Sequence, residues 1–219
     1  MGEPARHDLV WLRPRWRAHL RGHLPPGAAD QVDEWCARGR PLVARRRGPS
    51  EPPDVVPLGV ALPLRCGRTR IALAVEPAAV DRAAPPLRLA AALTSAPPAW
   101  RPALSALDQA ARAVGSSLGV YGSLAWQHLS GEPCLHDGSD VDLLATPRSS
   151  LELERVLALL RARALDESPR LDGEVVLEDG RAVAWRELLA PLRQVLVKSA
   201  DAVAIVSRAE VLASLEPSP

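Results

Sequence analysis

The sequence lacks phenylalanine altogether and has only one tyrosine, one methionine and three cysteines in 219 residues. The cysteines, Cys36, Cys66 and Cys134, are far apart and form neither a CxxC pair nor a cluster with histidine. This spacing argues against a zinc site or a disulfide framework and favours a reducing compartment. The chain also lacks a run of about 18 apolar residues, and its start lacks the apolar core of a signal peptide. We therefore expect a cytoplasmic protein without a membrane span.

Neither sign of charge dominates, because 27 basic and 26 acidic residues give a formal net charge of +1. A near-neutral chain argues against dedicated nucleic-acid binding, since such proteins are usually strongly basic. The charge is nevertheless divided unevenly. Residues 1–70 carry 13 arginines against seven acidic residues, a net of +6, and residues 71–219 carry a net of −5. This asymmetry indicates two functionally different halves.

Lysine is almost absent: it occurs once, at Lys198, beside 26 arginines. An excess of Arg, Ala and Pro is what GC-rich coding produces, so the single lysine is the more informative residue. Hydrophobic residues make up 47% of the chain, enough to build a core. The length allows one large domain or two small ones.

Prolines at 77, 85 and 86 mark a boundary between two predicted domains, residues 1–82 and residues 85–213. The first is predicted as a small α+β domain, with a helix capped by Asp30 and a hairpin of strands at 58–64 and 70–75. The second alternates strands and helices. Its predicted helices lie at 100–114, after 123, at 151–165, at 184–189 and in the tail 209–219, and its strands lie at 118–121, 139–145, 173–177 and 195–198.

Two carboxylates in the second domain form the most informative pattern. Asp140 and Asp142 flank Val141 on a predicted strand, where residues i and i+2 point to the same face, roughly 7 Å apart. Two like charges at this spacing repel each other unless a cation lies between them. Mg²⁺ prefers oxygen ligands and commonly takes one or two carboxylates together with substrate phosphates. We expect one or two Mg²⁺ ions here, or Mn²⁺ in their place; the alternative is a solvated strand edge.

Gly122 and Ser123 lie 17 residues before this pair, where a short apolar strand runs into a helix. Such a junction exposes backbone N–H groups at the positive end of the helix dipole, which favours phosphate binding. A common turn is the alternative. Glu174, at the start of a later strand, is the candidate third carboxylate, as a metal ligand or as the proton acceptor from an attacking hydroxyl. The alternative for Glu174 is a solvated strand end.

The order Gly-Ser, helix, then Asp-x-Asp on a strand resembles the nucleotidyltransferase superfamily, which includes DNA polymerase beta. A closer resemblance covers nearly the whole chain, to the phosphoribosyl-dephospho-CoA transferases of malonate decarboxylase systems, also called malonate decarboxylase holo-acyl-carrier-protein synthases. The segments that carry it are residues 6–12, 40–46, 58–63, 121–127, 139–144, 171–176 and 184–188. The resemblance implies an α+β protein with a polymerase-beta-like, mixed-sheet catalytic domain behind the small N-terminal domain.

The reaction implied by the resemblance transfers a prosthetic group to a carrier protein. The donor would be triphosphoribosyl-dephospho-CoA, and a serine hydroxyl of the malonate decarboxylase acyl-carrier subunit would attack its α-phosphate and release pyrophosphate. Metal ions, a phosphate cradle and a hydroxyl nucleophile suit this chemistry. Arg45, Arg46 and Lys198 are candidate further phosphate contacts; for the two arginines, a solvated basic strand end is the alternative.

Other functions remain open from the residues alone. The chain could act on a citrate lyase carrier protein, transfer a nucleotide from a nucleoside triphosphate to a small molecule or RNA, or be a silent scaffold. Retention of Asp140, Asp142 and Glu174 argues against the scaffold. The basic N-terminal half fits an acidic carrier protein as partner, although it could equally hold the donor's phosphates.

Overall fold

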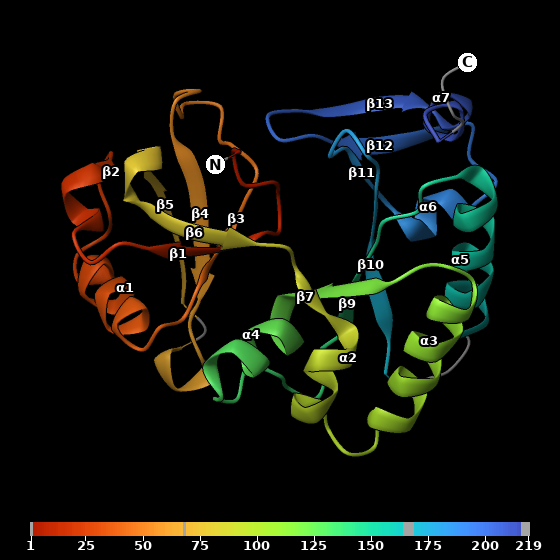
Figure 1. Cartoon of the computed structure of the whole chain (residues 1–219), viewed down its shortest axis with the longest axis horizontal. Coiled ribbons are helices and arrows are strands. Elements are labelled where there is room, and N and C mark those ends of the chain that lie inside the picture. Colours follow the sequence, from red (N-terminus) through yellow and green to blue (C-terminus); the bar gives the residue numbers. More distant parts are fainter. Residues whose placement is uncertain (1, 68, 164–168, 216–219) are drawn as a thin grey trace. The chain divides into compact units, whose positions relative to one another are not determined.

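The computed structural model describes residues 2–67, 69–163 and 169–215. The chain forms two compact units (Figure 1), Met1–Pro86 with Leu129–Cys134, and Leu87–His128 with Leu135–Pro219. The division at Pro86 lies a few residues beyond the predicted end of the first domain. The assignment of Leu129–Cys134 to the first unit has no counterpart in the sequence pattern. Helices combined with antiparallel and mixed sheets confirm the predicted α+β class.

The first unit is built on a six-stranded antiparallel sheet with the strand order β2-β5-β4-β3-β1-β6. Its strands are β1 (Leu9–Leu12), β2 (Leu20–Arg21), β3 (Leu42–Ala44), β4 (Val56–Ala61), β5 (Arg70–Val75) and β6 (Val80–Ala84), and its helix is α1 (Ala28–Ala37). Strands β4 and β5 pair along their whole length, which confirms the predicted hairpin.

Helix α1 begins earlier than the sequence pattern predicts. Its N-cap is Gly27, which has a left-handed backbone (φ 76°), and Asp30 lies inside the first turn. The prediction that Asp30 caps this helix was therefore wrong. A carboxylate in the first turn still interacts favourably with the positive end of the helix dipole, which explains its preference for this position.

The second unit contains a seven-stranded sheet with the order β13-β12-β11-β10-β9-β8-β7, in which only β9 and β10 run parallel. The strands are β7 (Leu87–Arg88), β8 (Leu118–Tyr121), β9 (Val141–Ala145), β10 (Leu171–Val176), β11 (Ala182–Ala184), β12 (Gln194–Lys198) and β13 (Val203–Ser207). The helices are α2 (Leu89–Ala92), α3 (Arg101–Ala113), α4 (Gly122–Ser130), α5 (Ser150–Arg163), α6 (Trp185–Leu189) and α7 (Arg208–Ala213).

Most of the predicted elements of this unit are present with shifted ends. The strand predicted from Ser139 begins two residues later, at Val141, so Asp140 precedes it. The predicted end of the fifth helix at Leu165 and the predicted tail beyond Leu215 lie outside the described residues. Strand β13 was not predicted. It forms the edge of the sheet, and its Val203 and Ile205 are exposed.

The seven-stranded sheet has two chemically different faces. One face packs into the core of the unit with residues such as Leu143 on β9, Val175 on β10 and Val197 on β12, together with apolar side chains of α3, α5 and α6. Because side chains alternate along a strand, the residues between them point to the other face. That face carries Asp142, Asp172, Glu174 and Lys198, and we call it the acidic face.

None of the helices within the described residues combines the length and the apolar character that a membrane crossing requires.

Candidate active site

Gly122 and Asp142, both predicted site residues, lie directly against each other in the structure. Gly122 begins helix α4 directly after strand β8, and β8 pairs with β9 so that Tyr121 lies opposite Asp142. A Cβ atom added at Gly122 would lie 1.8 Å from the Asp142 Oδ2 atom, and the Gly122 backbone is left-handed (φ +66°). Glycine is therefore required at this position on both steric and conformational grounds. The structure thus brings the predicted phosphate-binding turn directly against the Asp-x-Asp strand.

Helix α4 is held in place by polar contacts within the second unit. Gln127 Nε2 donates a hydrogen bond to the Ser95 carbonyl (2.7 Å), and Gln127 Oε1 accepts one from the backbone N–H of Leu135 (3.2 Å). Ser123, the second residue of the helix, is partly exposed. A fixed helix start with partly exposed glycine and serine is the arrangement that binds phosphate oxygens.

Asp140 lies in the loop just before β9, where it contacts Arg170. The Arg170 Nε atom lies 2.9 Å from Asp140 Oδ1, and Arg170 Nη2 contacts the same oxygen. The Arg170 side chain is 64% exposed, so its guanidinium group can exchange this partner for another anion. Arg170 was not predicted as a site residue; its position directly before the strand that pairs with β9 is the signal that could have found it.

Asp172 is a second residue that the sequence analysis missed. In the parallel pairing of β9 and β10 it lies opposite Asp142, on the acidic face of the sheet. Its side chain is half exposed, with Arg186 Nε 3.8 Å from Asp172 Oδ1. Asp172 therefore places a solvent-accessible carboxylate on the strand next to Asp142.

Glu174 lies two residues further along β10, opposite Leu144. It is only 4% exposed, and its Oε1 accepts a hydrogen bond from Lys198 Nζ at 2.7 Å. Lys198 comes from β12, two strands away, and is one-third exposed. The structure thus brings together two predicted site residues, but as a buried carboxylate that holds a partly exposed ammonium group.

The backbone between Asp172 and Glu174 is itself unusual. Gly173 has φ +137°, and a Cβ atom there would lie 1.9 Å from the carbonyl oxygen of Leu143 on β9. Only glycine fits such a close approach of two strand backbones. Gly173 thereby allows the strand pairing that aligns Asp172 with Asp142.

The two aspartates suit a hard cation whose remaining ligands are water and substrate phosphates. In the described part of the chain, no group of three or more His, Cys, Asp or Glu residues lies close enough to hold a metal ion. The predicted set of Asp140, Asp142 and Glu174 is therefore not assembled as one cluster. Asp142 still offers carboxylate oxygens beside the start of α4, and Asp140 precedes it by two residues in the loop before β9. Mg²⁺ commonly takes one or two carboxylates and completes its shell with water and substrate phosphates, so this pair fits it.

The two predicted arginine contacts belong to the first unit. Arg45 donates hydrogen bonds to the carbonyls of Leu58 (3.0 Å) and Leu73 (3.2 Å), and its guanidinium group pairs with Glu51 (2.8 Å). These bonds hold the loop before β4 and lower the pKa of Glu51, mainly through the hydrogen bond from Arg45. Arg46 is exposed. The phosphate contacts predicted for both residues stay predictions.

Family models match the chain over almost its full length. The model of the phosphoribosyl-dephospho-CoA transferase MdcG N-terminal domain matches residues 5–86, and that of the MdcG C-terminal domain matches residues 87–209. The chain belongs to this transferase family. The resemblance found in the sequence is thereby confirmed, and the two matched regions meet at the same residues as the two structural units.

Relatives named phosphoribosyl-dephospho-CoA transferase span nearly the same length as this chain. The protein of Xanthomonas campestris pv. campestris strain 8004 is 41% identical, covering 93% of this chain and 94% of its own. The relatives of Bradyrhizobium diazoefficiens (94% and 91% covered) and Pseudomonas putida (94% and 95% covered) are 38% and 33% identical. No solved structure matches the chain.

Proposed function

We propose that this protein transfers the phosphoribosyl-dephospho-CoA group from a triphosphoribosyl donor to a serine of the malonate decarboxylase acyl-carrier subunit, with release of pyrophosphate. The observation that carries the proposal is the contact of Gly122, at the start of α4, with the Asp142 carboxylate on β9. A phosphate-binding helix start and a metal-binding carboxylate then act on the same phosphate chain. The name shared by the relatives, phosphoribosyl-dephospho-CoA transferase, supports the identity of the transferred group.

The start of α4, the two aspartates around β9 and Arg170 would each bind part of the triphosphate. Backbone N–H groups and the Ser123 hydroxyl at the start of α4 would donate to phosphate oxygens. Asp140 and Asp142 would hold Mg²⁺, which would supply Lewis-acid stabilisation of the charge that develops on the phosphates. Arg170 would leave Asp140 and turn its guanidinium fork toward the donor phosphates.

The bond changes of the transfer are a phosphoryl substitution. The serine oxygen of the carrier forms a bond to the α-phosphorus of the donor, while the bond from that phosphorus to the oxygen of the leaving pyrophosphate breaks. Asp172, half exposed and opposite Asp142, is positioned to accept the proton of the serine hydroxyl. Lys198, oriented by Glu174, would contact the departing phosphates as a point charge.

The malonate decarboxylase carrier is the acceptor that the family resemblance implies, and the citrate lyase carrier is the alternative acceptor. We expect the reaction in the cytoplasm, because Cys36, Cys66 and Cys134 are all free thiols in the structure. No nucleic acid is needed as a substrate.

Intact-mass spectrometry of the carrier tests the proposal directly. The protein is mixed with Mg²⁺, triphosphoribosyl-dephospho-CoA and the apo carrier of malonate decarboxylase, and pyrophosphate release is followed in parallel. We expect the carrier to gain the mass of the phosphoribosyl-dephospho-CoA group with one pyrophosphate released per carrier. A mass gain without pyrophosphate would contradict the proposed leaving group.

Parallel reactions separate the alternatives. In one, the apo carrier of citrate lyase replaces that of malonate decarboxylase; in another, ATP or CTP replaces the donor. Faster labelling of the citrate lyase carrier would reassign the acceptor. Labelling of RNA or a small molecule by a nucleoside triphosphate, with no mass gain on either carrier, would overturn the proposal.

A further inference from the structure

The first unit contains an arginine-rich surface pocket that the proposed chemistry does not use. It measures about 80 Å³ and is lined by Trp35, Arg38, Arg40, Leu62, Pro63 and Arg65, among others. Arg38 and Arg40 follow the end of α1, and Arg65 lies in the 3-10 turn Leu64–Cys66 between β4 and β5. We call it the arginine pocket.

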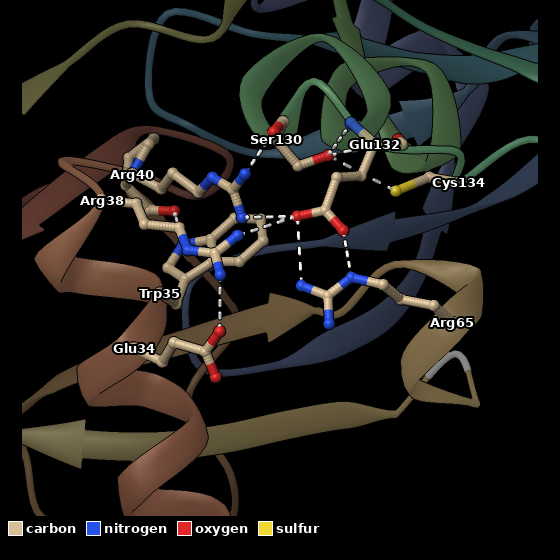
Figure 2. Close-up of polar contacts among 9 residues, drawn as sticks. Glu34, Trp35, Arg38, Arg40, Arg65, Ser130, Glu132 and Cys134 are labelled. Atoms are coloured by element: carbon tan, nitrogen blue, oxygen red, sulfur yellow. Dashed lines mark hydrogen bonds and ion pairs between the residues drawn. The ribbon is translucent and has the colours of Figure 1, made fainter.

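The three arginines converge on the carboxylate of Glu132 (Figure 2). Its Oε1 atom lies 3.0 Å from Arg40 Nη1 and 3.3 Å from Arg38 Nη1, and Arg65 contacts both carboxylate oxygens. These bonds, chiefly those of Arg65 and then Arg40, lower the pKa of Glu132 to about 2. The carboxylate therefore stays ionised and fixes all three guanidinium groups beside one another.

The arginine pocket contains more positively charged than negatively charged side chains. Besides Glu132, Arg38 contacts Glu34 (Nη2 to Oε1, 2.6 Å), so three guanidinium groups share two carboxylates. Guanidinium groups carry more N–H donors than these carboxylates can accept from. The side chains of Arg38 and Arg65 are 46% and 55% exposed, whereas Glu132 is 18% exposed. Arg38 and Arg65 thus face solvent together with Glu34, which is 61% exposed, whereas Glu132 and Arg40 are largely covered, so the exposed part of the pocket carries one more positive than negative group.

The floor of the arginine pocket is rigid and apolar. Trp35 is buried, donates from Nε1 to the Pro41 carbonyl (2.8 Å), and stacks under the Arg40 guanidinium group at 4.9 Å. Leu62 and Pro63 beside it are also buried. Arginines already held in one arrangement lose little conformational entropy on binding a partner, which favours affinity.

We propose that the arginine pocket is the docking surface for the acidic carrier protein, with Arg38 and Arg65 binding carboxylates of the carrier on either side of one apolar side chain. This inference rests on the proposed function, because it names the surface that receives the acceptor. Charge complementarity carries it: the exposed donors belong to arginines, in the half of the sequence with a net charge of +6. A volume of about 80 Å³ fits a single side chain and is far below the roughly 300 Å³ of a small-molecule site.

The test is the affinity of the full-length protein for the apo malonate decarboxylase carrier, measured by calorimetry without donor. The double variant Arg38→Gln/Arg65→Gln removes the two exposed charges and leaves Arg40 to hold Glu132. We expect at least about ten-fold weaker binding and a smaller loss of affinity with added salt than in the wild type. Arg21→Gln is the matched control, because Arg21 is 54% exposed and contacts one carboxylate, that of Glu76. It lies opposite Ala74 of β5, at the end of the β4–β5 hairpin away from Arg65.

Steady-state kinetics then separate docking from chemistry. We expect the double variant to raise KM for the carrier about ten-fold, with kcat and KM for the donor within about two-fold. Unchanged carrier affinity in the double variant, or no binding of the carrier by the wild type, would overturn the inference. So would a rise in KM for the donor with carrier binding intact, which would make the pocket a donor site. Failure of the wild type to transfer while it binds the carrier would count against the proposed function alone.

Discussion

Gly122 lies so close to the Asp142 carboxylate that position 122 has no room for a side chain. Replacing Gly122 by alanine would place a methyl group on the Asp142 carboxylate and strain a left-handed backbone. We expect Gly122→Ala to lose transfer activity and at least about 3 kcal/mol of unfolding free energy. Gly180→Ala is the control: its φ is +79°, but nothing lies within 4 Å of the added Cβ, so it should cost only roughly 1–2 kcal/mol. Thermal and denaturant unfolding measure both variants. Equal losses of unfolding free energy in Gly122→Ala and Gly180→Ala would contradict the close contact.

Asp172 and Glu174 differ in exposure and in their partners. We therefore expect the substitutions Asp172→Asn and Glu174→Gln to affect kcat, KM and stability differently. Asp172→Asn is expected to lower kcat about 10²- to 10⁴-fold with little change in stability, because its carboxylate is half exposed and is the group proposed to accept the serine proton. Glu174→Gln removes the charge that holds Lys198, and should raise KM for the donor about ten-fold while costing about 3 kcal/mol of stability. Separate kcat and KM measurements with thermal unfolding check both. If Glu174→Gln instead loses kcat alone, Glu174 is the third catalytic acid.

At the scale of elements, the sequence predicts individual strands, turns and helices better than the pairing of strands in the sheet. The strand, Gly-Ser turn and helix at residues 118–130, and the Asp142 strand after them, follow from local periodicity and glycine placement. The partnership of Asp172 with Asp142 depends on the register of two strands about 30 residues apart, which no local pattern encodes. The prediction of Glu174, one pleat further along β10, as the third acid stays a prediction.

Edge elements and cross-domain segments were also hard to predict. Strand β13 alternates little in polarity and follows a loop directly, so its pairing with β12 gave no periodic signal. The segment Leu129–Cys134 packs with the first unit through Glu132, and through a hydrogen bond from the Leu64 backbone N–H to the Pro133 carbonyl (3.0 Å). Both contacts join residues more than 60 positions apart.

The Glu132 cluster predicts a pH dependence of stability. Because the arginines lower the folded-state pKa of Glu132 to about 2, its contribution is fully present above the unfolded value of about 4.3 and is lost as the pH falls through 2. We expect Glu132→Gln to lower Tm at pH 7, and the difference from wild type to shrink between about pH 4 and 2. Glu178→Gln, at an exposed position of the second unit, is the control. A constant difference across this range would contradict the ion cluster.

At the scale of the whole molecule, charge is divided between a basic half and an acidic half. Binding of an acidic carrier to exposed arginines should weaken with salt, whereas chemistry at the carboxylates proposed to bind Mg²⁺ should respond much less. Raising NaCl from about 50 to 300 mM should increase KM for the carrier several-fold and leave kcat within about two-fold. An equal effect on both parameters would indicate that salt acts on catalysis rather than on docking.

The central claim is that the acidic face of the second unit, with Asp142 against the start of α4, carries out the transfer. Its most direct test is the intact mass of the carrier after incubation with donor, Mg²⁺ and either wild-type protein or Asp142→Asn, with Asp179→Asn as an exposed control. We predict full modification by the wild type and by Asp179→Asn, and a rate reduced at least about 10³-fold in a folded Asp142→Asn variant. Modification of the carrier by Asp142→Asn at the wild-type rate would contradict the account.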